Sequence, residues 1–131
     1  MPRDEFDAIR RAGEPPDDAE QLREDYIDHL TTIETAYGAL RDALDRGTGA
    51  MRVVAEHVHR GGRASDFKGL IEPGPLRANL STAMTDFERA RHRGQQLFFR
   101  LLISEGMTMA DIARAWGISR QLVSRLVNEP D

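Results

Sequence analysis

The sequence predicts an all-α fold: a helical hairpin or bundle scaffold with a helix-turn-helix at its C-terminal end. Apolar residues recur at intervals of four and three in two long segments, one in each half of the chain. This is the spacing of a helix that buries one face. A third apolar pattern, near the C-terminus, is divided by a single glycine, as expected for two short helices joined by a tight turn.

The N-terminal half is expected to contain a tail and two helices. Residues 1–18 hold Gly13, Pro15, Pro16 and several acids, which predicts a flexible acidic tail. From Ala19 to about Arg46 the chain has no proline, and its apolar stripe predicts a long helix. The stripe consists of Leu22, Tyr26, Leu30, Ile33, Tyr37, Leu40 and Leu44. Gly47-Thr48-Gly49 is expected to break this helix, and a shorter helix follows over about 50–60.

A second long helix is predicted from about Leu76 to Glu105, after a connector at 63–75. Its stripe consists of Leu76, Leu80, Ala83, Phe87, Ala90, Gly94, Leu97 and Leu101. Two helices with matching stripes pack most simply as an antiparallel pair within one chain. Pairing between two chains is the other solution, and the two are compatible if the hairpin buries one face and leaves another, such as Phe98 with Leu102, for a neighbour. Residues 19–105 are therefore predicted to form a scaffold and dimerisation region.

The signals that delimit the last two helices are local and specific. Gly106 ends the preceding helix, and Thr108 with Asp111 three residues later forms a variant of the capping box. Gly117 supplies the residue of positive φ that the turn requires, and Ser119 can cap the second helix.

Residues 98–131 are predicted to form the helix-turn-helix unit. Ala113 is the small residue at the crossing of the two helices, and the end of the preceding long helix supplies the third helix of the unit. The apolar residues expected between the pair are Ile112, Trp116, Ile118, Val123 and Leu126. Those expected from the long helix, packing on Trp116 and Leu126, are Phe98, Phe99, Leu101 and Leu102.

The outer face of the last helix carries side chains that read bases or bind phosphates. With Leu122, Val123, Leu126 and Val127 turned inward, the polar set is Ser119, Arg120, Gln121, Ser124, Arg125 and Asn128. Arginine pairs with the guanine edge, and glutamine or asparagine with the adenine edge. The segment resembles the helix-turn-helix regulator superfamily, in particular the compact resolvase-type and sigma-factor-type DNA readers. This resemblance implies that the helix beginning at Ser119 enters the major groove of double-stranded DNA, while the helix beginning at Met109 crosses the backbone.

The distribution of charge agrees with a DNA-binding C-terminus, although the whole chain has a net charge of −4. Residues 1–46 carry six Arg against thirteen acids, and residues 47–88 are balanced at five against five. Residues 89–131 carry seven Arg against four acids, a net of +3. Arg89, Arg91, Arg93 and Arg100 either widen the basic surface or form an ordinary solvated helix face.

Several other classes are not expected. The chain has no cysteine, which excludes disulfides and thiol-ligated zinc, and no apolar run long enough to span a bilayer. His57 and His59 are two apart on a helix and point away from one another, so no metal site is predicted. No cofactor and no catalytic constellation is expected, and a reducing cytoplasm is the expected location.

Two hypotheses follow from the sequence. The favoured one is a sequence-specific DNA-binding transcriptional regulator that works as a homodimer and is not an enzyme. Two readers on a two-fold axis reach half-sites about one helical turn apart, roughly 34 Å. The alternative is a protein-interaction adaptor, in which the acidic helix over residues 19–46 docks a partner protein and the helix-turn-helix gives only weak or nonspecific DNA binding.

Overall fold

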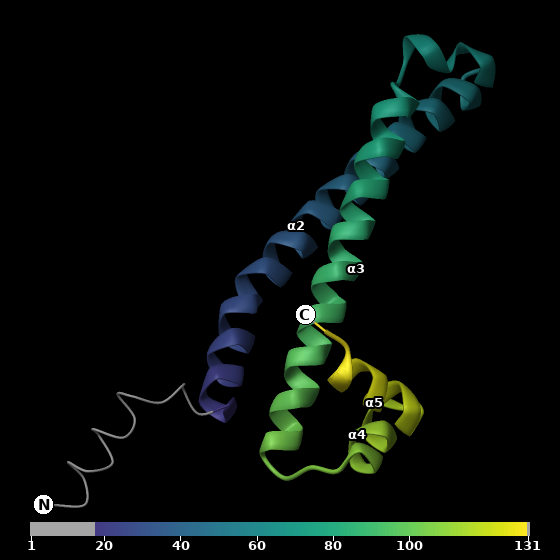
Figure 1. Ribbon diagram of the computed structural model, residues 1–131. Helices are drawn as coiled ribbons and strands as arrows, with labels where there is room; N and C mark the ends of the chain where they lie inside the picture. The colour runs from purple at the N-terminus through teal and green to yellow at the C-terminus, as the bar shows by residue number, and fades with distance from the viewer. Residues whose placement is uncertain (1–17, 131) are drawn as a thin grey trace, which may run out of the picture. The chain divides into compact units, whose positions relative to one another are not determined.

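The computed structural model describes residues 18–130 (Figure 1). The elements are α2 (Asp18–His59), the 3-10 helix η1 (Ala64–Gly69), α3 (Pro73–Ser104), α4 (Met109–Trp116) and α5 (Arg120–Asn128). No strand occurs in this part of the chain, and the predicted all-α fold is confirmed. The predicted acidic tail lies outside the described residues, except for Asp18, which begins α2. The chain divides into two compact units.

The first unit, the hairpin unit, spans Leu30–His92 and contains most of α2, η1 and the first part of α3. Within it α2 and α3 run antiparallel, joined through η1 (Figure 1). Four alanines are buried between the two helices: Ala36, Ala43, Ala83 and Ala90. Small residues at these positions let two helix backbones approach closely. At the side of this seam, the rings of Tyr37 and Phe87 lie edge to face, with centroids 4.8 Å apart.

The α3 stripe is confirmed, but the predicted α2 stripe is displaced by one residue at two positions, and a third member, Leu30, is exposed. Leu30, Tyr37 and Leu44 are at least 40% exposed, whereas Ala36 and Ala43, each next to one of these large residues, are buried. A prediction based on large apolar side chains assigns Tyr37 and Leu44 to the buried face. The buried positions are instead held by alanines, because two helices that pack closely have room only for small side chains.

The predicted break at Gly47-Thr48-Gly49 is wrong, because α2 continues without interruption to His59. Neither glycine has a positive φ. The Thr48 hydroxyl donates to the carbonyl of Leu44 at 3.0 Å, one turn earlier. A glycine costs an α-helix about 1 kcal/mol relative to alanine, and packing along the seam offsets a cost of this size. The predicted end of the shorter helix, at about residue 60, agrees with the structure within one residue.

A polar contact closes the end of the hairpin. His57 Nε2 lies 2.8 Å from Asp66 Oδ2, and the same oxygen accepts from the backbone N–H of Arg63 at 3.1 Å. The hydrogen bond with His57 is the main cause that lowers the pKa of Asp66. The His57 ring occupies the space that a Cβ on Gly62 would need. α3 then begins at Pro73, earlier than predicted, because proline is tolerated in a first helical turn.

The second unit, the helix-turn-helix unit, combines the start of α2 and the end of α3 with α4 and α5. Its core contains three fully buried side chains, Phe99, Ile112 and Val123, together with Ala113 and Leu126. The predicted use of the end of α3 as a third helix is therefore correct. Leu101 is buried outside this cluster, which corrects one of the four residues predicted to supply it.

The suggestion that Phe98 and Leu102 remain open for a neighbouring chain is also wrong. Phe98 stacks within the unit on Tyr26, at 5.3 Å between ring centroids, and on Trp116, at 5.7 Å. Leu102 is partly buried against the core. Because the start of α2 returns to this end of α3, it covers a position that looked free in the sequence.

Candidate nucleic-acid interface

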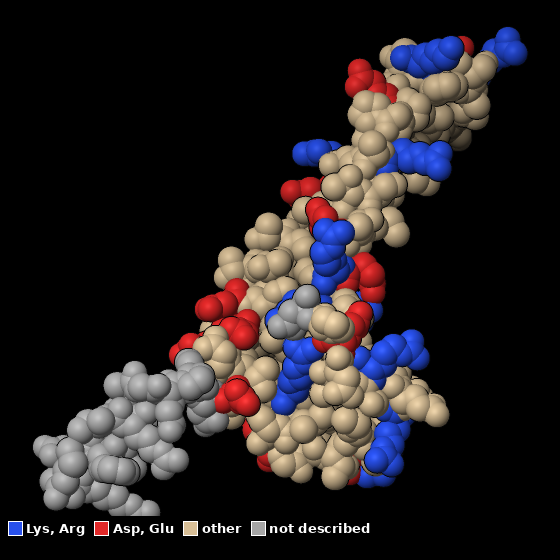
Figure 2. Space-filling view, viewed as in Figure 1, with Lys and Arg blue, Asp and Glu red and all other residues tan. Residues whose placement is uncertain are grey.

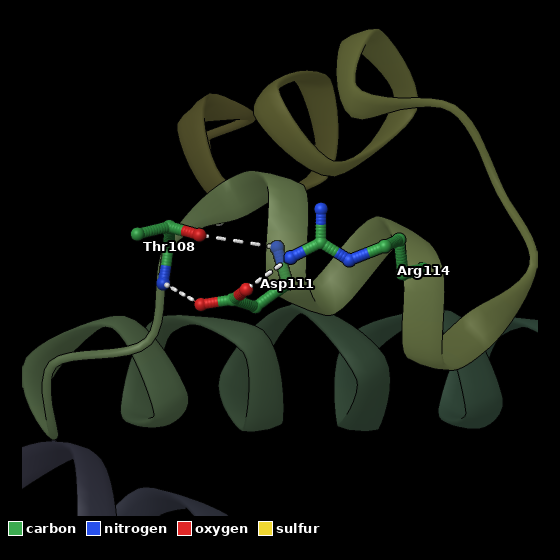
Figure 3. Close-up of polar contacts among 3 residues, drawn as sticks. All are labelled: Thr108, Asp111 and Arg114. Carbon is green, nitrogen blue, oxygen red and sulfur yellow. Dashed lines mark hydrogen bonds and ion pairs between the residues drawn. The ribbon is translucent and has the colours of Figure 1, made fainter.

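The first helix of the motif, α4, begins at a complete capping box (Figure 3). The Thr108 hydroxyl accepts from the backbone N–H of Asp111 at 3.1 Å, and the Asp111 carboxylate accepts from the N–H of Thr108 at 3.3 Å. Arg114 forms an ion pair with the same carboxylate, one turn further along α4. The hydrogen bonds from Thr108 are the main cause that lowers the pKa of Asp111, and Arg114 adds to the effect. The predicted cap is confirmed.

The turn between the helices depends on a left-handed glycine, as the sequence predicted. Gly117 has φ 68° and ψ 34°, a conformation that residues with a Cβ rarely adopt. Its N–H and that of Ile118 both donate to the carbonyl of Ala113, which ends α4. Ser119 then caps α5 by accepting from the N–H of Leu122 at 3.1 Å. The direction of α5 is thus set by caps on both sides of the turn.

Aromatic contacts attach the motif to α3. Phe99 is fully buried and lies edge to face with Trp116, with ring centroids 5.0 Å apart. Trp116, predicted to belong to the apolar face, contacts both Phe98 and Phe99 yet keeps 41% of its surface exposed. The two short helices are therefore held by a long one, and their outer faces remain available.

The predicted reading residues lie on that outer face of α5. Five of the six are exposed and Ser124 is partly so: Ser119, Arg120, Gln121, Ser124, Arg125 and Asn128. The side chains of Arg120, Gln121 and Arg125 make no hydrogen bond or ion pair with any residue of 18–130. Asn128 differs, because its side-chain N–H donates to the Ser124 carbonyl at 2.9 Å. Basic side chains project from the surface over α4 and α5 (Figure 2).

Two arginines outside the predicted set also bear on this surface. Arg114 is exposed on α4, the helix expected to cross the DNA backbone, and its basic character was visible in the sequence. Arg100 was considered only as a surface charge. It donates instead to the carbonyls of Val127 and Glu129, at 2.9 and 2.5 Å, and so ties the end of α5 to α3. Beside it the buried Gln96 donates to the Glu129 carboxylate at 3.2 Å.

Among residues 18–130 no three His, Asp or Glu side chains are grouped so that they could hold a metal ion. None of the helices described here is both long enough and apolar enough to cross a membrane.

The same segment is similar to a known protein family. Residues 96–129, which are 34 of the 131, match the model of the MarR family. This match begins on the buried side of α3 and ends one residue after α5, so it covers the three packed helices described above. No curated protein and no solved structure matches the chain. The C-terminal segment is therefore a helix-turn-helix of the DNA-binding regulator type, which confirms the resemblance found in the sequence.

Proposed function

We propose that this helix-turn-helix makes the protein a sequence-specific DNA-binding transcriptional regulator that acts as a homodimer. One observation carries the proposal. α5 presents Arg120, Gln121 and Arg125 without partners among the described residues, on a helix fixed by two caps and a buried core. Unpaired donors on a rigid helix suit the edges of base pairs, because no internal hydrogen bond has to be broken and the helix backbone is already ordered before binding.

The proposed reading helix is α5, lying in the major groove. Its first turn carries Arg120 and Gln121, and the N-terminal residues of a recognition helix are those that reach base edges. Arg125 lies on the same outer face, for a guanine or a phosphate. Ser119, Ser124 and Asn128 supply further polar contacts at the edges of the helix. Arg114 on α4 is placed for the phosphate backbone.

The proposed assembly follows from the reach of a single motif. One helix-turn-helix contacts few base pairs, whereas two on a two-fold axis read half-sites one helical turn apart. We assign residues 98–131 to DNA binding and residues 19–105 to the scaffold that pairs two copies.

The experiment is selection of binding sites from random double-stranded DNA at physiological salt. Wild type is expected to enrich one sequence, and Arg120→Ala/Arg125→Ala is expected to lose the enrichment while keeping its helical circular dichroism. Each lost base contact of this type weakens binding by about 1–3 kcal/mol. The matched control is Arg41→Ala/Arg52→Ala, which removes two exposed arginines of α2, outside the motif, and should still enrich the same site.

Two results would contradict the proposal. One is equal enrichment by wild type and Arg120→Ala/Arg125→Ala. The other is weak, salt-sensitive binding by wild type with no preferred sequence, which would favour the adaptor hypothesis and direct the search to partners of the acidic residues 19–46.

A further inference from the structure

A row of large apolar side chains lies exposed along α2 in the hairpin unit. The row consists of Leu30, Tyr37, Leu44, Met51 and Val58, each seven residues from the next and each between 40% and 73% exposed. Residues spaced by seven fall on nearly one line along a helix. α2 is continuous through this region, so the line runs for about 40 Å. We call it the outer row.

The outer row is separate from the seam that holds the hairpin together. Ala36 and Ala43 form the α2 side of that seam, and each precedes a row residue by one position. On α3, Met84 follows the seam residue Ala83 in the same way and is 55% exposed. In an antiparallel pair the positions one residue after the seam face the same side, so Met84 extends the apolar surface across both helices.

The surface is hollowed at one end of the row. A groove of about 600 Å³ lies between α2 and α3, lined almost wholly by apolar groups that include Gly47, Met51, Val54 and Leu80. Arg77, one residue after the seam position Leu76, also lines it, which agrees with the side assigned to the row. By contrast, Arg46 and Asn79 line a more polar hollow in the same unit, near η1.

The occupant of this surface is constrained by its length, period and area. A straight line with a seven-residue period is matched by another helix of similar length. The five row residues and Met84 expose on the order of 600 Å² per chain, close to what each partner contributes to a standard interface. A patch of this size is at the upper end of what a monomer leaves in water. A second copy of the chain carries a helix of matching length and period, its own α2.

We propose that a second copy of this chain docks along the outer row, placing two hairpin units face to face with their Met84 side chains and apolar grooves inside. The outer row is then the dimer surface of the proposed regulator. This inference rests on the proposed function only for the purpose of the dimer, which is to pair two DNA-reading helices.

The test is the oligomeric state of the full chain by sedimentation velocity between about 1 and 100 µM. Wild type is expected at twice the chain mass of 14.7 kDa. Leu44→Glu/Met51→Glu places two carboxylates in the row and is expected to raise the dimer dissociation constant by about 100-fold or more. The matched control Ala39→Glu/Val53→Glu adds the same charges at exposed positions on the opposite side of α2 and should remain dimeric.

A crosslink provides a second readout that does not depend on charged variants folding. The chain has no cysteine, so Leu44→Cys introduces a single thiol at the middle of the row. Oxidation is expected to link two copies through Leu44→Cys and not through Val53→Cys. Wild type that stays monomeric over the whole concentration range overturns the inference, as does dimerisation of Leu44→Glu/Met51→Glu as strong as that of the control.

DNA binding separates this inference from the proposed function. Leu44→Glu/Met51→Glu keeps α5, so it should bind one half-site like wild type and lose the added affinity for two. A dimer that depends on the row but selects no DNA sequence would overturn the proposed function and leave the dimer surface established.

Discussion

Arg100 shows how one side chain fixes the end of the proposed reading helix. A helix leaves its last carbonyls without intrahelical donors, and a basic side chain can satisfy them. Arg100 does so from α3, binding the carbonyls of Val127 and Glu129. Charged donors make stronger hydrogen bonds than neutral ones. Arg100 therefore fixes the position of α5, the proposed reading helix.

Replacing Arg100 by alanine is expected to lower the free energy of unfolding by about 1.5–3 kcal/mol, the usual range for hydrogen bonds to a charged group. DNA affinity should also fall further than charge loss alone explains. Arg89→Ala is the control, since it removes one exposed positive charge from the same helix. Thermal unfolding and titration with the selected DNA provide the two measurements. Equal melting temperatures and affinities for the two variants would contradict this role.

The residues predicted correctly from sequence are those with local signals. Thr108, Asp111, Gly117 and Ser119 each act on a neighbour within six residues, so their roles can be recognised from spacing alone. The role of Arg100 was not predictable in this way. Its partners lie 27 and 29 residues away, and only the packing of α5 on α3 brings them together.

At the scale of the element, α4 is a helix of eight residues, too short to be stable by itself. Its stability therefore depends on its cap as well as on the core beneath it. The cap includes an ionised group, because hydrogen bonds from Thr108 lower the pKa of Asp111 below its ordinary value. A carboxylate with a lowered pKa in the folded state stabilises that state above the pKa of the unfolded chain, and the contribution disappears as the pH falls through the folded pKa.

Asp111→Asn is accordingly expected to melt at a lower temperature than wild type above about pH 5, and the difference should narrow as the pH falls below the ordinary pKa of an aspartate. Thermal unfolding at a series of pH values measures this. Asp45→Asn serves as the control, because Asp45 is an exposed carboxylate on α2, and its difference from wild type should be small throughout. A difference in melting temperature between Asp111→Asn and wild type that stays constant from neutral to acid pH would show that the carboxylate charge does not contribute to the cap.

The long helices were predicted less accurately than the short ones. The period of four and three identified both, since it reflects burial of one face. It misplaced the α2 seam because Ala36 and Ala43 carry little hydrophobic signal beside Tyr37 and Leu44. The predicted break at Gly47 was wrong because a glycine destabilises a helix by only about 1 kcal/mol. Packing along a long seam contributes more than this.

At the scale of the whole molecule, the charges separate along the chain. The last 43 residues, 89–131, carry the net positive charge, while residues 1–46 are strongly acidic. Binding to the phosphate backbone is therefore expected to depend on few cations, and the proposed sequence-specific complex is expected to hold two copies on one DNA. In such a complex, the spacing and orientation of the two half-sites determine the affinity.

Changing the spacing of the half-sites tests this directly. Inserting about half a helical turn, roughly five base pairs, rotates one half-site to the other side of the duplex. A dimer joined through the outer row is expected to lose about tenfold or more in affinity, down to the level of one half-site. A competition assay with the original site, the insertion and a single half-site measures the effect. Equal affinity for the original site and the site with the insertion would indicate two copies that bind independently.

Trp116 gives the helix-turn-helix unit its own spectroscopic signal. It is the single tryptophan of the chain, and it lies against Phe98 and Phe99 at the junction of α4 with α3. Fluorescence of its half-exposed indole therefore reports separation of the motif from α3, whereas far-ultraviolet circular dichroism is dominated by the long helices. If the two compact units unfold independently, the two optical transitions will not coincide. The wild-type sequence thus contains a probe for stepwise unfolding without any label.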